Sequence, residues 1–242
     1  MTSDDLAQRP LPTDSVGLIE GMSSTRAIRR YADEPVPEAA LRDMCFLATR
    51  APSGSNRQPY RFMVFSDGPK AAEVKATIAK GARAVWGGKR EHDSYDKGSG
   101  AVENSPKARM AATMQHFVDH FEEVPVVVLP CLERYREPNE MESASIYPAV
   151  QNLLLAARGL GYGGVFTGFN KLVEDELRTL LEVPDHVFMA GTVTIGRPVG
   201  HHGPVRRRPL SELVYAGVWG QSAPWAIDPP GTEHTQAGPP KK

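Results

Sequence analysis

Three arginines occur within five positions near the start of the chain, at Arg26, Arg29 and Arg30, beside the apolar residue Ile28. A guanidinium is a permanent cation with a planar fork of N–H donors, so it binds a phosphate monoester through paired, charge-assisted hydrogen bonds. A single arginine in such a place is more often an ordinary solvated side chain. The grouping of three favours a site for a phosphorylated ligand.

A second informative segment is residues 51–60, with the sequence Ala-Pro-Ser-Gly-Ser-Asn-Arg-Gln-Pro-Tyr. Ser53 and Gly54 are typical of a turn that ends a helix, but such a turn does not need the amides of Asn56 and Gln58. Side-chain amides and backbone N–H groups can hydrogen-bond the edge of a flat polar ring. Together, the two segments predict a site for a phosphorylated aromatic cofactor.

The two segments resemble the FMN-dependent nitroreductase family. The first matches the family's Arg-x-x-Arg-x-Tyr motif, and the second matches Ala-Pro-Ser-Gly-x-Asn-x-Gln-Pro-Tyr-x-Phe. Other segments of the chain also match the family, in the family's order. Each segment alone is a weak signal, but together they are a strong one and cover about residues 15–216. The further matching segments are Glu34–Pro37, Tyr147–Asn152, Gly161–Phe169, Ile195–Pro198 and Arg207–Glu212.

This resemblance implies an α+β fold, with a mostly antiparallel central sheet flanked by helices, in an intertwined homodimer with two FMN sites at the subunit interface. It divides the chain into an N-terminal arm over residues 1–13, one FMN-binding domain over 14–220 and a C-terminal tail over 221–242. Residues 82–108 are rich in glycine and scattered charges, so we expect an irregular lid there. We expect the Pro- and Gly-rich tail to be extended or disordered and to embrace a partner subunit.

Hydrophobic periodicity and turn residues predict the elements that position these segments. The helix over 146–158 is apolar on more than one side, which is typical of a helix buried between two surfaces and fits a dimer interface. Helices are expected over about 14–22, from Pro37 to before Pro52, and over 69–81, 109–122, 146–158 and 172–181. Strands are expected over 61–66, 125–131 and 187–195.

The resemblance also implies which residues bind the cofactor. The arginine segment would bind the phosphate and the pyrimidine side of the flavin, and the amides within 52–58 would bind the isoalloxazine edge and the ribityl hydroxyls. A backbone amide within 166–168 would reach flavin N5. The implied residues are Arg26, Ala27, Arg29, Pro52, Ser53, Gly54, Asn56, Gln58, Phe166, Thr167, Gly168, Arg206 and Arg207.

Arg29 is the expected electrostatic stabiliser, as the cation near flavin N1 where reduction deposits negative charge. Thr25 and Ala27 stand where the family usually has Arg and Ser. Backbone amides, or Arg206 and Arg207, must therefore supply part of the phosphate contact. We expect no obligatory catalytic acid, base or nucleophile, because a flavin supplies its own redox chemistry.

The implied function is an NAD(P)H-dependent FMN oxidoreductase. NADPH or NADH would reduce FMN, and a small electron-poor acceptor such as a nitroaromatic or a quinone would then enter the same pocket in ping-pong turnover. One alternative is a non-catalytic FMN-binding or storage protein. Another is a halotyrosine-type reductive dehalogenase, for which Glu91 and Tyr95 have a suggestive spacing but Val118 stands where a lysine is expected. Ala27 replaces the aspartate of the flavin-fragmenting branch.

Composition narrows the class of protein. The chain has 242 residues, 40 % of them hydrophobic and 24 % charged, enough to bury one sizeable core. A net charge of −1 gives no reason to expect nucleic acid or an anionic membrane as partner. Cys45 and Cys131 lack metal-ligand spacing, so no metal site is expected. No apolar leader or membrane-spanning run is visible, which predicts a cytoplasmic location.

Two further patterns have ordinary interpretations. Gly159–Gly164 satisfies GxGxxG, but it follows a predicted helix rather than a strand, so it does not indicate a dinucleotide-binding fold. We expect Gly159 to cap that helix. His201 and His202 lie in a Gly/Pro turn and are expected to be exposed.

Overall fold

The computed structural model describes residues 5, 9–139 and 141–235. Its centre is a five-stranded sheet in the order β1-β2-β5-β3, in which β4 also pairs with β2. All of these pairings are antiparallel, which confirms the predicted α+β class. The strands are β1 Tyr60–Phe65, β2 Val126–Glu133, β3 Gly163–Thr167, β4 Val187–Met189 and β5 Thr192–Gly196.

The central strand β2 is buried on both faces, because helices cover the sheet on both sides. Successive side chains of a strand point to opposite faces. Val126 and Val128 therefore join one hydrophobic core, whereas Val127 and Leu129 join the other. This is why the segment is a continuous apolar run rather than an alternating one.

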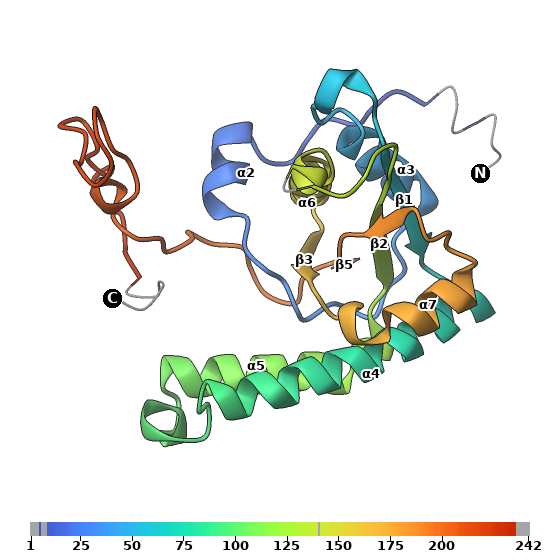
Figure 1. Ribbon diagram of the computed structural model, residues 1–242. Coiled ribbons are helices and arrows are strands. Elements are labelled where there is room, and N and C mark those ends of the chain that lie inside the picture. The colour runs from blue at the N-terminus through green and yellow to red at the C-terminus, as the bar shows by residue number, and fades with distance from the viewer. Residues whose placement is uncertain (1–4, 6–8, 140, 236–242) are drawn as a thin grey trace.

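Helices on the two faces build the two cores (Figure 1). On one face, α3 Glu38–Ala48 packs on α6 Ile146–Gly159, and α2 Leu18–Ser24 also contacts α6. On the other face lie α4 Pro69–His92, α5 Pro106–Asp119 and α7 Glu174–Leu181. The short 3-10 helices are η1 Gly54–Asn56, η2 Gly98–Ala101, η3 Phe121–Glu123, η4 Glu142–Ala144, η5 Lys171–Val173 and η6 Leu210–Glu212.

Residues 82–108 are mostly helical, so the predicted irregular lid was wrong in its secondary structure. The helix expected to end at residue 81 continues to His92, and α5 already begins at Pro106. Trp86 holds the two helices together, because it is buried, lies 5.1 Å from the Tyr95 ring and donates to Gln115 at 2.9 Å. In Figure 1 this helical hairpin extends beyond the edge of the sheet.

The predicted strand over 187–195 is two strands, β4 and β5, separated at Ala190 and Gly191. A Cβ on Gly191 would lie 2.3 Å from the ring of Phe166, so the break makes room for that ring. The predicted helix over 172–181 begins as η5 and becomes α7 at Glu174.

Two predicted helix ends also differ from the structure. The helix expected from about residue 14 is α2, which begins at Leu18 after Gly17. Gly159 is the last helical residue of α6 and not its cap. The left-handed residue that turns the chain is Gly161, with a φ of 82°.

The described ends of the chain are irregular. Residues 9–13 form no helix or strand, and Arg9 fastens this arm to the buried Asp43 at 2.6 Å. Beyond Val205 the chain leaves the body and forms a small separate lobe (Figure 1), on which Trp219 is 93 % exposed. The predicted arm and tail also include residues 1–4, 6–8 and 236–242, which lie outside the described residues.

Candidate cofactor site

The arginine segment lies along the edge strand β3. Ile28 is buried there, and its N–H donates to the carbonyl of Gly164 at 3.0 Å. The hydroxyl of Tyr31 donates to the carbonyl of Ile28 at 2.7 Å, which fixes the backbone between them. Arg26 is exposed beside this anchor and donates to the carbonyl of His201 at 2.6 Å.

Arg29 is a partly buried cation that forms no ion pair with a carboxylate among the described residues, although Glu123 lines the same small pocket. Its Nε is buried and has no hydrogen-bond partner among the described residues. Burial lowers the pKa of this guanidinium, because desolvation disfavours the charged form. A buried donor without a partner is costly, so Arg29 fits a bound anion.

The loop over 53–58 has a strained backbone. Ser55, Asn56 and Gln58 all have a φ near 50°, in the left-handed region that residues other than glycine seldom adopt. The Ser53 hydroxyl accepts the Gln58 N–H at 2.9 Å and helps to hold this shape. Residues 54–58 remain exposed. Strain of this kind is typical of binding sites. The Gln58 amide donates to Asn56 Oδ1 at 3.2 Å, so the two exposed amides lie side by side.

The segment 166–168 lies at the other end of β3 from the arginines. Phe166 is 37 % exposed, and its ring contacts the ring of Tyr147 edge to face, with centroids 5.8 Å apart. The hydroxyl of Thr167 donates to the carbonyl of Thr192 at 3.3 Å. These contacts place the segment near the first turn of α6.

The candidate residues therefore form two groups at opposite ends of α6. At the last turn of α6, Arg158 donates to the Ser24 hydroxyl at 3.4 Å, and Ser24 precedes the arginine segment in the sequence. Before its first turn, Ser145 accepts the Gly54 N–H at 3.3 Å. A helix of 14 residues is about 21 Å long. One chain does not bring the arginines and the 53–58 loop together.

Arg206 and Arg207 are less available than the sequence suggests. Arg206 forms an ion pair with Glu233 at 2.5 Å, so its charge is offset within the C-terminal lobe. Arg207 donates to the carbonyl of Arg206 at 3.0 Å and has no carboxylate partner among the described residues. The N–H of Val205 donates to Ser23 at 3.3 Å, which places both arginines near the end of α2.

Sequence reasoning missed Arg158 and His202, which lie beside Arg26. His202 is only partly exposed, not exposed as predicted, and its ring packs so close to Gly163 that a Cβ there would approach it to 3.0 Å. Burial, and then the charges of Arg158 and Arg26, lower the pKa of His202. Its Nδ1 and the Nε of Arg158 are buried without partners in the described structure. A charged residue at the end of the apolar α6 was the available signal.

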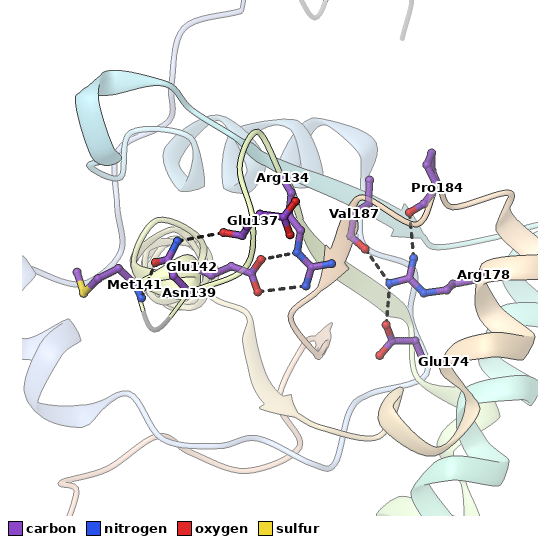
Figure 2. Close-up of polar contacts among 9 residues, drawn as sticks. All are labelled: Arg134, Glu137, Asn139, Met141, Glu142, Glu174, Arg178, Pro184 and Val187. Atoms are coloured by element: carbon purple, nitrogen blue, oxygen red, sulfur yellow. Dashed lines mark hydrogen bonds and ion pairs between the residues drawn. The ribbon is translucent and has the colours of Figure 1, made fainter.

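A cavity of about 220 Å³ separates the 52–54 segment from the loop that joins β2 to α6. That loop folds back on itself because Arg134 at the end of β2 pairs with Glu142 through both carboxylate oxygens (Figure 2). Figure 2 also shows Asn139 bonded to the backbone of Glu137 and Met141. The neighbouring α7 is tied to β4 where Arg178 donates to Val187 at 2.7 Å.

The position where the dehalogenase lysine was expected, Val118, does not take part in a lid. Val118 is buried in the core between α5 and the sheet, so its position faces no ligand. Tyr95 lies against Trp86, with the Lys107 ammonium 5.4 Å from its ring centroid. The part of the chain that the structure describes contains no cluster of metal-ligating side chains. It also contains no helix long and apolar enough to cross a membrane.

The protein is an α+β fold with an antiparallel sheet, and it carries a partly buried arginine and a strained, amide-rich loop. The model of the nitroreductase family matches residues 22–197. The chain therefore belongs to the nitroreductase family, and the oxidoreductase class follows from that membership.

Individual relatives agree with this assignment. A protein called NADH dehydrogenase from Thermus thermophilus is 27 % identical over 78 % of this chain and 90 % of its own length. Chloronitrobenzene nitroreductase from Comamonas testosteroni is 24 % identical over 71 % of this chain and 82 % of its own. A crystal structure of a putative nitroreductase in complex with FMN from Desulfovibrio desulfuricans has a TM-score of 0.61 and 26 % identity. The match covers 85 % of this chain and 99 % of the Desulfovibrio chain.

Proposed function

We propose that this chain is an FMN-dependent oxidoreductase that uses NADPH or NADH to reduce small electron-poor acceptors such as nitroaromatics or quinones. The observation that carries the proposal is Arg29, a cation whose buried Nε lacks a partner among the described residues. The Desulfovibrio relative binds FMN, and two relatives bear the names of an NADH dehydrogenase and a nitroreductase.

FMN, when bound, would supply hydride transfer between the nicotinamide and the acceptor, in ping-pong turnover. Arg29 would hold positive charge beside the pyrimidine edge, and Arg26 would bind the phosphate. The exposed amides of Asn56 and Gln58 would orient the ring edge. The chain's contribution is placement and electrostatic stabilisation by groups that are already fixed.

We propose further that each site is composite and lies between two copies of the chain. A two-fold axis that pairs α6 with its copy in the antiparallel sense sets the arginine end of one helix beside the loop end of the other. The face of α6 that carries Leu155 and Ala156 supports such a pairing. With Leu18 and Leu47 these residues line an apolar groove of about 470 Å³.

The test begins with the purified protein and its flavin content. We expect a yellow protein with about one FMN per chain, or an apoprotein that takes up FMN in preference to riboflavin because the arginines bind phosphate. A protein that releases no flavin on heating and binds no added FMN would refute the proposal.

Anaerobic addition of NADPH or NADH separates the oxidoreductase from a storage protein. Loss of the visible flavin absorbance with either nicotinamide, followed by its return when a nitroaromatic or a quinone is added, is the expected result. Colour that persists with both nicotinamides would favour storage.

A further inference from the structure

The 220 Å³ cavity beside the 52–54 segment has room for one substituted ring. An apolar cavity of about 150 Å³ already holds benzene in another protein. The cavity of the present protein is lined by the apolar residues Pro52, Pro59, Leu132 and Met141, among others. The same cavity borders Ser53 and Gly54, which the proposed function assigns to the flavin ring edge. A molecule in it would therefore lie next to the reacting ring.

Two guanidiniums lie against the aromatic side chain at this cavity. Arg136 lines the cavity itself, whereas Arg57 lies over the Tyr135 ring beside it. The Tyr135 ring is 49 % exposed, with Arg57 at 4.8 Å and Arg136 at 5.4 Å from its centroid. A cation over a ring face is held in place, but its charge is not neutralised. Neither arginine has a carboxylate partner within the described residues, whereas Arg134 is already paired with Glu142.

Two acids line the same cavity, and one of them, Glu142, is already paired with Arg134. Glu137 lines the cavity, and only its backbone carbonyl takes part in a hydrogen bond given by the structure, to the amide of Asn139 at 3.2 Å. Its carboxylate weakens the attraction for an anion without cancelling both cations. Because Arg136 and Glu137 balance each other within the lining, the excess positive charge beside the cavity is that of Arg57. This charge favours an anionic group on the Tyr135 side, and the exposed ring favours a flat one.

We propose that this cavity binds a single-ring aromatic carboxylate as the electron acceptor, such as a nitro-substituted benzoate. The ring would lie against the apolar wall and Tyr135, and the carboxylate would be bound by Arg57 and Arg136 through charge-assisted hydrogen bonds. This inference rests on the proposed function, since it names the acceptor class for the same site.

The test compares 4-nitrobenzoate with its neutral isostere 4-nitrobenzamide as acceptors for the FMN-loaded protein. We expect a higher kcat/KM for the carboxylate, and a decrease of about tenfold in the carboxylate-to-amide ratio in the double variant Arg57→Gln, Arg136→Gln. Glu137→Gln should raise the ratio. Arg61→Gln is the matched control, because Arg61 lies nearby but is already paired with Glu133 at 2.5 Å, and its ratio should not change.

A second measurement does not depend on turnover. Benzoate cannot be reduced here, so its binding to the oxidised holoprotein can be followed by calorimetry and by the change in flavin absorbance. We expect binding that weakens with added salt and is lost in the double variant but kept in Arg61→Gln.

The outcomes distinguish the two proposals. Equal use of the two acceptors, or a ratio that the double variant does not change, overturns the carboxylate site and leaves the oxidoreductase intact. If NADPH and NADH both leave the flavin oxidised, the oxidoreductase proposal fails instead. Benzoate that does not bind to the oxidised holoprotein overturns the carboxylate site whatever the turnover result.

Discussion

Arg29 shows how much of a binding residue's role depends on what surrounds it. The spacing of the arginines predicted a cation for an anionic ligand, and the fold adds that Arg29 is partly buried while Arg30 is exposed. Burial removes water that would otherwise screen the charge, so a bound group interacts with Arg29 more strongly than with an exposed arginine.

We expect Arg29→Ala to lower the midpoint potential of the bound flavin, because reduction adds negative charge that loses its neighbouring cation. A decrease of some tens of millivolts is reasonable, since ~30 mV corresponds to about 1.4 kcal/mol for a two-electron couple. Spectroelectrochemistry measures it, with Arg30→Ala as the exposed neighbour whose effect should be smaller. An unchanged potential in Arg29→Ala would move the stabilising role to Arg57 or Arg207.

Single residues also show where sequence reasoning stops. The turn residues of 53–58 were predictable from composition, but the left-handed φ of Ser55 was not, since Asn and Gly are the usual residues there. His202 was expected in solvent, because nothing local indicates that β3 and α6 fold over it. Its burial depends on Gly163, which lies against the ring, and on the Tyr162 carbonyl 3.3 Å from Nε2, both distant in sequence.

Among the elements, α4 departs most from prediction. Its glycines and charges suggested that the helix ends at residue 81, because each glycine weakens a helix by about 1 kcal/mol relative to alanine. Tertiary contacts outweigh that cost, since Trp86 is buried and Arg90 pairs with Asp96 beyond the expected end. By contrast, the helices and strands with regular apolar spacing were predicted close to their observed bounds.

Two glycines of α4 should respond oppositely to the same substitution. A Cβ on Gly81 would lie 2.2 Å from the carbonyl oxygen of Phe169, whereas a Cβ on Gly87 would meet nothing within 4 Å. We expect Gly81→Ala to destabilise the protein by about 1–3 kcal/mol through overpacking. Gly87→Ala should stabilise it by about 0.5–1 kcal/mol through helix propensity. Chemical denaturation of both variants measures the free energy of unfolding; equal effects would mean that α4 does not pack on η5 as described.

At the scale of the whole molecule, α6 explains why the candidate residues are split. The sequence predicted this helix and its apolar circumference, and that pattern already favoured an interface. It could not show that the arginines lie at one end of α6 and the 53–58 loop at the other, because that depends on the order of strands in the sheet. The composite site proposed above follows from this separation.

Mixed dimers test the composite site directly. Arg26→Ala with Arg29→Ala removes the cationic half, and Asn56→Ala with Gln58→Ala removes the amide half, so each parent dimer should bind FMN weakly at both sites. In a mixed dimer, co-expressed with two affinity tags, one site combines both defects and the other is intact. We therefore expect one tightly bound FMN per mixed dimer, measured by flavin fluorescence after release. Mixed dimers that bind no more FMN than the parents would place the whole site within one chain, as would a stable monomer that keeps FMN in sedimentation.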